Sequence, residues 1–168
     1  ALLEDLAMAN RIFGQQVGIL DIQGHVSVRS QTDPDHYYIS RYLSPGAVTV
    51  ADLIENDLDS HAVAGPRTDQ ASETHLHGPL YKARPDVMAI VHAHTPELVA
   101  FGMSSVPLWH GESRVPVWDI RRYNEGRTGT VQTPVRGVAM AEEGLGSSDS
   151  LLLWGHGMAV TASSLQEL

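Results

Sequence analysis

The sequence predicts an α/β fold in which helices pack against a mixed sheet, and three segments carry this prediction. Residues 1–17 repeat apolar side chains at helical spacing, as at Leu6 and Phe13, which indicates an amphipathic helix. Residues 24–29 alternate polar and apolar side chains, as a strand with one buried face does. Residues 87–91 form a wholly apolar run that predicts a buried strand. We expect the first helix to lie on the sheet.

Several shorter elements are expected between these two strands. Residues 37–40 predict a strand, and the Pro-Gly pair at 45–46 predicts a turn. Residues 49–52 have the spacing of a capping box, which indicates one short helical turn. Residues 54–63 predict a further pair of strands.

A helix is expected on each side of the apolar run. Before it, residues 72–84 carry apolar side chains at helical spacing, with Ser72 as a cap and Pro85 as a stop. After it, a Thr-Pro-Glu sequence supplies a cap, a proline at the first helical position and an acid in the first turn. The second helix is therefore expected over residues 95–103.

The remaining third of the chain predicts strands, a helix and a helix start. Residues 106–120 suggest one or two strands, and residues 135–145 a helix that ends at Gly146. Residues 151–154 predict another buried strand. Residues 161–168 resemble the first turns of a helix, so we expect a single domain over 1–168 that lacks a C-terminal element.

Composition narrows the class of protein. A formal net charge of -9 without a lysine-arginine block argues against nucleic acid or an anionic membrane as a partner. The chain has no cysteine, so nitrogen and oxygen atoms must hold any metal. No segment approaches the roughly 20 apolar residues of a membrane span, and the acidic first residues lack the basic region of a signal peptide. We therefore expect a cytoplasmic protein.

The main functional signal is a pair of histidines, His92 and His94, directly after the apolar run. In a strand, residues i and i+2 point to the same face, so both imidazoles can bind one divalent metal ion. His156, between two glycines after a buried-looking strand, is the third candidate ligand. Glu73 adds a carboxylate in the first turn of the helix expected before the apolar run.

Simpler interpretations exist for the histidines. A His-X-His pair can merely end a strand, and His156 alone fits a turn residue as well as a ligand. His77 lies four residues after Glu73 on one helical face, so it suits a group beside the ligands or substrate, or a partly buried histidine with an ordinary partner. His36 and His61 lie in polar stretches and are expected at the surface.

Several other chemistries lack their motifs. The sequence contains no Gly-X-Ser-X-Gly, no cysteine nucleophile and no His-Glu-X-X-His. Lys82, the one lysine, lies on an amphipathic helix, which argues against a Schiff base. A cupin also uses His-X-His, but the helices on both sides argue against an all-β barrel, and the chain is too short for an amidohydrolase barrel.

Four motifs in a fixed order connect the chain to a known family. They are residues 24–29, Ser72-Glu73 with His77, residues 81–94, and residues 155–157. With these motifs the chain resembles the class II aldolase/adducin family along nearly its whole length. The resemblance implies an α/β/α layered fold with a central, largely antiparallel sheet. It also implies a homotetramer with active sites near subunit interfaces, partly built from the C-terminal region.

The same resemblance assigns roles to the candidate residues. It implies a divalent metal on His92, His94 and His156, with Glu73 as a fourth ligand or proton-transfer group. Manganese or zinc is expected, with iron and cobalt as alternatives, since imidazole and carboxylate donors accept several metals. Three imidazoles leave open positions at which a substrate with adjacent oxygens can chelate the ion.

Departures from the family pattern favour a particular substrate class. Sugar-phosphate members carry Asn where His25 stands and Ser-Ser-Glu where residues 71–73 stand, and those side chains hold the phosphate. His25 can instead donate to a carboxylate, with Arg29 or Arg67 as a clamp. The other expected substrate-binding residues are Ser27, Ser72 and His77.

The chain therefore looks more like the decarboxylases of this family, which act on hydroxylated aromatic or pyridine carboxylates. Two alternatives stay open. One is an aldolase or epimerase acting on a sugar phosphate or a hydroxy-keto substrate, and the other is a non-catalytic, adducin-like scaffold.

Overall fold

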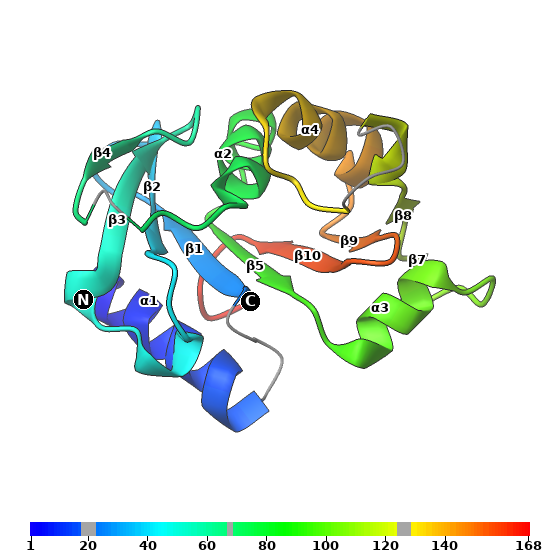
Figure 1. Ribbon diagram of the computed structural model, residues 1–168, viewed down its shortest axis with the longest axis horizontal. Coiled ribbons are helices and arrows are strands. Elements are labelled where there is room, and N and C mark those ends of the chain that lie inside the picture. The colour runs from blue at the N-terminus through cyan, green and yellow to red at the C-terminus, as the bar shows by residue number, and fades with distance from the viewer. Residues whose placement is uncertain (18–22, 67–68, 124–128) are drawn as a thin grey trace.

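The computed structural model describes residues 1–17, 23–66, 69–123 and 129–168, which form a mixed α/β fold (Figure 1). Its centre is an eight-stranded sheet in the order β4-β3-β2-β1-β5-β10-β9-β8. The neighbours pair antiparallel except β8 and β9, which pair parallel. The strands are β1 His25–Arg29, β2 His36–Ser40, β3 Leu53–Asp57, β4 Ala62–Ala64, β5 Ala89–Ala93, β8 Val117–Trp118, β9 Ser150–Leu153 and β10 Gly157–Ala162.

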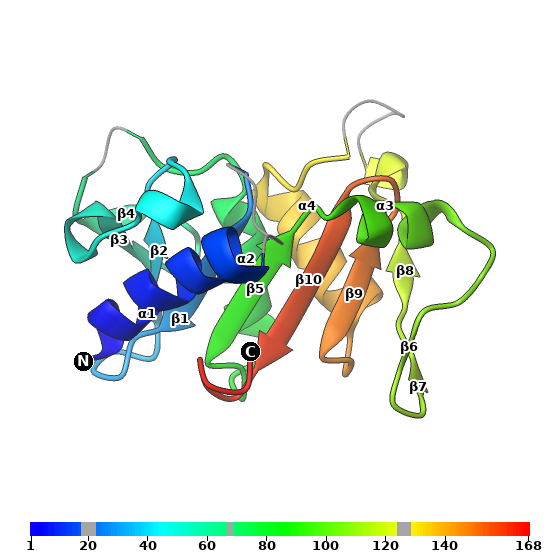
Figure 2. The same cartoon turned by 90° about the horizontal axis from the view of Figure 1, so that it is seen from below.

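Helices cover both faces of this sheet. On one face lie α2 (Thr74–Ala83) and α4 (Pro134–Ala139), and on the other lie α1 (Leu2–Arg11) and α3 (Pro96–Met103) (Figures 1 and 2). Each face has its own apolar core, because alternate strand residues point in opposite directions. The expected α/β/α layers and largely antiparallel sheet are confirmed.

The β5 strand shows how the two cores are divided. Ile90 packs with Leu76 and Leu80 of α2, whereas Val91 packs with Leu6 of α1 on the opposite face. His92 is two residues after Ile90 and so faces α2, the side on which the functional cluster forms.

Most helix ends agree with the capping signals. The Thr95 side chain accepts a hydrogen bond from the Leu98 amide at the start of α3, and Thr49 and Asp52 form the expected capping box around a 3-10 turn at Val50–Asp52. Both α1 and α4 continue as π-helical turns, over Ile12–Val17 and Met140–Leu145. Gly146 follows the second turn with a φ of 54°, a conformation that favours glycine.

Two expectations for the last third of the chain need correction. Residues 106–120 contain three two-residue strands: β6 (Trp109–His110) and β7 (Ser113–Arg114) form a separate hairpin, and β8 joins the sheet edge. Residues 157–162 form β10, a strand that the sequence pattern did not predict. Since Thr161 and Ala162 pair with β5, the expected helix start is occupied by strand, and residues 165–167 form only a turn.

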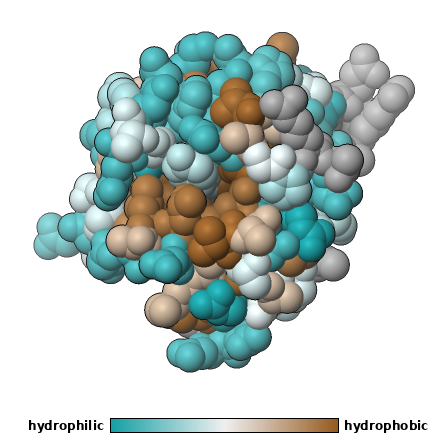
Figure 3. Space-filling view, turned by 90° about the vertical axis from the view of Figure 1, so that its left-hand side faces the viewer, coloured by the Kyte–Doolittle hydropathy of each residue, from teal (hydrophilic) through white to brown (hydrophobic). Residues whose placement is uncertain are grey.

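Apolar side chains also reach the surface. Figure 3 shows them grouped within polar surroundings on the side of the molecule at which β3 and β4 lie. Val63 on the edge strand β4 is 37% exposed. Among the described residues, no helix has both the length and the apolar character that crossing a membrane requires.

Candidate metal centre

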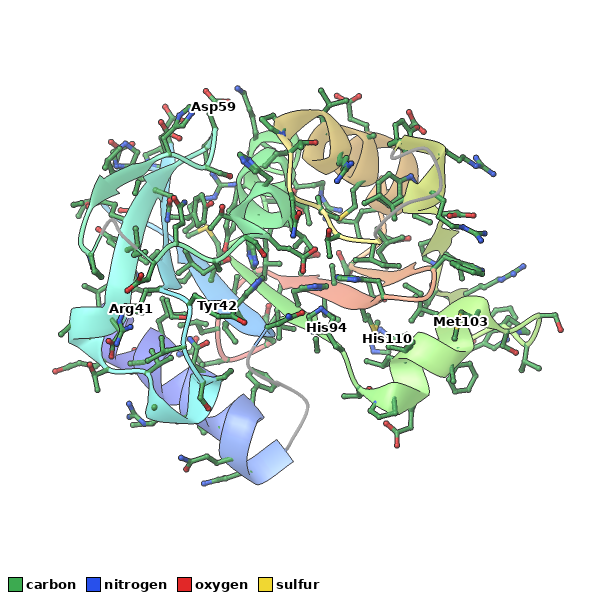
Figure 4. All side chains as sticks on the ribbon, viewed as in Figure 1. Arg41, Tyr42, Asp59, His94, Met103 and His110 are labelled. Carbon is green, nitrogen blue, oxygen red and sulfur yellow. The ribbon has the colours of Figure 1, made fainter. Side chains whose placement is uncertain are left out.

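Four side chains from distant parts of the chain converge at one point. One ligand atom each from Glu73, His92, His94 and His156 lies within 4.8 Å of all the others. The Nε2 atom of His156 is 3.1 Å from that of His92 and 3.2 Å from that of His94. Oε2 of Glu73 is 3.2–3.9 Å from the three Nε2 atoms. In Figure 4, His94 lies in the middle of the molecule, where β5 ends.

The fold positions each of these groups separately. His92 is on β5, His94 is just beyond its end, and Glu73 is the N-cap residue of α2, although its side chain does not cap the helix. His156 lies in the turn between β9 and β10, beside Gly157. A Cβ atom on Gly157 would be 2.2 Å from the Ala93 carbonyl oxygen, so this residue must be glycine for β10 to pair closely with β5.

The hydrogen bonds of the cluster suit a divalent cation. His92 Nδ1 donates to the Met158 carbonyl at 3.0 Å, so its Nε2 carries the lone pair that a metal requires. The Val131 amide donates to Glu73 Oε1 at 2.7 Å, which leaves Oε2 for the histidines. Such a set of imidazole nitrogens and one carboxylate is one that zinc and manganese accept. The residues therefore fit the expected metal.

Glu73 is held as a carboxylate. Burial alone raises the pKa of its carboxyl group, but the imidazoles of His156 and His92 outweigh burial, and the pKa lies below its ordinary value. An ionised carboxylate at this position can bind a cation or accept a proton.

Behind the cluster, three of the expected substrate-binding residues form a hydrogen-bonded line. Nδ1 of His25 and Nε2 of His77 are 2.8 Å apart, and Nδ1 of His77 is 2.7 Å from Oγ of Ser27. The Tyr81 hydroxyl is 2.8 Å from the same Oγ. His25 lies opposite His92 in the β1–β5 ladder, with ring centres 5.4 Å apart. Burial, aided by His92, lowers the pKa of His25 to about 3, so its imidazole is neutral.

The structure does not bring Arg29 to the cluster. Arg29 is at the other end of β1 from His25, and its guanidinium donates to four main-chain carbonyls. These carbonyls belong to Pro34, Tyr81, Arg84 and Val87. With its donors used in this way, Arg29 ties β1 to the segments around it.

Ser72, another expected substrate-binding residue, also lies outside the cluster. Ser72 directly precedes Glu73, but its side chain is exposed and lines an open surface hollow with Gln70 and Gln132. Arg67 lies outside the described residues.

Three groups around the candidate metal centre were not predicted from the sequence. The Val131 amide and the Met158 carbonyl are main-chain groups, which leave no signal in a side-chain pattern. Tyr81 could have been found, because it is four residues after His77 and therefore shares its helical face.

The side chains that were given no role are engaged elsewhere. His36 bonds Glu55, His61 bonds Asp57, and Lys82 bonds Asp59.

Comparisons with known proteins agree with this fold. The chain is 29% identical over 153 residues to Decarboxylase NovR of Streptomyces niveus, across 86% of this chain and 56% of that protein. It is 28% identical over 181 residues to 3,4-dihydroxyphthalate decarboxylase of Arthrobacter keyseri, across 98% of this chain and 70% of that protein. The chain spans about half the length of several curated relatives that it matches.

Solved structures and the family profile complete the comparison. An aldolase II superfamily protein from Pseudomonas syringae has the same fold, with a TM-score of 0.78 and 22% identity, across 98% of this chain and 66% of that one. The family profile described as Class II Aldolase and Adducin N-terminal domain matches residues 4–168. Because this match covers nearly the whole sequence, the chain belongs to the class II aldolase and adducin family.

Proposed function

We propose that the protein is a divalent-metal-dependent carbon-carbon lyase, and specifically a decarboxylase of a hydroxylated aromatic or pyridine carboxylate. The observation that carries the proposal is the convergence of three imidazoles and one carboxylate within 4.8 Å. Two relatives named as decarboxylases support the reaction type. His25 stands beside the cluster where sugar-phosphate members have an Asn that holds the phosphate, and this difference supports a carboxylate rather than a phosphate as the anionic group.

His92, His94 and His156 would hold the metal, with Glu73 as a further ligand or the proton-transfer group. Manganese or zinc suits these donors best, and iron or cobalt is compatible with them. When bound, the ion supplies a Lewis acid that stabilises negative charge developing on the substrate oxygens.

The protein side chains would carry out the remaining steps. In a decarboxylation the bond between the ring carbon and the carboxylate breaks, CO2 leaves, and the ring carbon must gain a proton. Glu73 is suited to supply that proton: as a carboxylate it can take the proton of the substrate hydroxyl group and then give it to the ring carbon, while the Val131 amide fixes one of its oxygens. His25 is proposed to contact the substrate directly, with His77 and Ser27 behind it in the hydrogen-bonded line.

We further propose a cytoplasmic homotetramer whose sites lie near subunit interfaces. His94 and His156 are only partly buried, so the cluster is close to the surface, where a neighbouring subunit can contribute to it. Sedimentation equilibrium of the full-length protein would give the mass of the assembly, and a monomer would contradict this part of the proposal.

The function is tested by metal content and substrate turnover in the full-length protein. After chelation and reloading with manganese or zinc, we expect CO2 release from 3,4-dihydroxyphthalate or a related hydroxy-aromatic or pyridine carboxylate. Cleavage of sugar phosphates alone would indicate an aldolase or epimerase instead. A protein that binds no metal and turns over neither class would be a scaffold, as adducin-like members are.

A further inference from the structure

A buried line of four side chains ends beside the metal centre, and three of its members have no direct part in the reaction proposed above. It runs from Tyr81 through Ser27 and His77 to His25. Tyr81, Ser27 and His77 are 0% exposed, and His25 is 4% exposed. Because water cannot complete these hydrogen bonds, each proton on the line must be taken by the next member.

The Tyr81 hydroxyl determines which member of the line donates in each hydrogen bond. Burial raises the pKa of this phenol, so it keeps one proton to donate. Its oxygen is 2.8 Å from Ser27 Oγ, and among the residues that the structure describes no other group accepts from it. A buried hydroxyl with a single neighbour donates to that neighbour, so Ser27 is the acceptor.

The positions of the other protons follow from this first bond. Ser27 has one proton, and its remaining close partner is Nδ1 of His77. A neutral His77 that accepts at Nδ1 carries its own proton on Nε2, and it donates that proton to Nδ1 of His25. His25 then holds its single proton on Nε2, the ring nitrogen that the line does not use.

We propose that Tyr81, Ser27 and His77 are positioning residues that hold His25 as an Nε2–H donor for an anionic oxygen of the substrate. His25 lies directly opposite His92 with ring centres 5.4 Å apart, so its ring is next to the candidate metal ligands. A donor fixed in advance needs no rearrangement when the substrate binds. If the hydrogen bonds of the line ran in the opposite direction, Nε2 of His25 would carry a lone pair, which repels a carboxylate. The nature of the substrate rests on the proposed function, whereas the position of the proton does not.

The proton position can be measured without any substrate. We would record 15N NMR spectra of the full-length, zinc-loaded protein labelled at histidine, with the His25→Gln variant to identify the His25 signals. We expect a protonated nitrogen at Nε2 and an unprotonated nitrogen at Nδ1 of His25. A proton on Nδ1 would overturn the proposal, whatever the activity of the enzyme.

A matched pair of variants tests the role of the line. Ser27→Ala breaks it, so both proton positions of His25 should become populated and KM for 3,4-dihydroxyphthalate should rise about tenfold, with a smaller change in kcat. Tyr37→Phe is the control, because Tyr37 is equally buried and stacks near His77, but its hydroxyl donates to Ser60 and Thr74. This control should leave the His25 signals and KM unchanged.

The results separate this inference from the proposed function. Unchanged His25 signals in Ser27→Ala, or equal effects of both variants, would refute the positioning role. If no carboxylate is turned over by the wild-type protein, the proposed function fails, and the NMR spectra still decide where the proton lies.

Discussion

Glu73 and Val131 are 58 positions apart in the sequence, and the Val131 amide donates a 2.7 Å hydrogen bond to the Glu73 carboxylate. This bond occupies Oε1 and leaves Oε2 at 3.2 Å from His156 Nε2 and 3.4 Å from His92 Nε2. A main-chain donor from the segment that leads into α4 thus orients the one acidic group of the cluster.

Replacing Glu73 by Gln should separate metal binding from proton transfer. The amide keeps the shape of the side chain, and its oxygen can still accept from the Val131 amide, but it can neither take up nor release a proton near neutral pH. We expect bound metal to be retained and kcat to fall by about 10²-fold or more. Elemental analysis and steady-state kinetics measure the two effects. Turnover at the wild-type rate would remove Glu73 from the reaction.

Substitution of either strand histidine should abolish metal binding. His92→Ala and His94→Ala each remove one of the three imidazoles, and the two that remain beside Glu73 are too few to hold a divalent ion firmly. His61→Ala is the matched control, since the His61 side chain is exposed and bonds Asp57, away from the cluster. Metal content by elemental analysis should be lost in the first two variants and kept in the third. Full metal content in all three would contradict the ligand assignment.

Gly157→Ala should disturb the pairing of β5 and β10 and the metal centre with it. The added Cβ would lie 2.2 Å from the Ala93 carbonyl oxygen and 3.0 Å from His94 Cδ2. We expect a loss of about 1–3 kcal/mol in the free energy of unfolding, together with weaker metal binding. Gly111→Ala is the comparison, because Gly111 has a φ of +59° but nothing within 4 Å of the new atom. Equal metal affinity in the two variants would show that the contact with β5 is unimportant.

The His36–Glu55 pair should give stability that depends on pH. The hydrogen bond to Glu55 raises the pKa of His36 above its ordinary value of 6.5. The protonated histidine is therefore favoured by folding, so the contribution is complete below 6.5 and is lost as the pH rises through the raised pKa. Because the pair is partly exposed, its contribution should be at most about 1 kcal/mol.

Urea unfolding of the wild-type protein and His36→Gln measures this effect. The difference between the two free energies of unfolding should be larger at about pH 5.5 than at about pH 8. A difference that stays constant, or that grows with pH, would show that the ion pair does not contribute.

The sequence was sufficient for much of the fold and for the four groups that converge. His92 and His94 follow an apolar strand, so the two-residue period alone indicates that they share a face. By contrast, β10 has small residues on its buried face, namely Gly157, Ala159 and Thr161, and such a face lacks the large apolar side chains by which a strand is recognised.

Partners fixed by tertiary structure could not be predicted. The period of β1 correctly places Arg29 on the same face as His25 and Ser27, but it does not show that four carbonyls surround the guanidinium. Likewise, no side-chain pattern reports that the Met158 carbonyl orients His92.

The spread of the ligands along the chain also sets an order of events. His156 reaches His92 only after β10 has paired with β5, a contact between residues more than 60 positions apart. We therefore expect that the unfolded chain has no cation site of comparable affinity and that folding precedes metal binding. Any bound ion then draws the folding equilibrium toward the native state by mass action, so chelation should lower the melting temperature of the loaded protein.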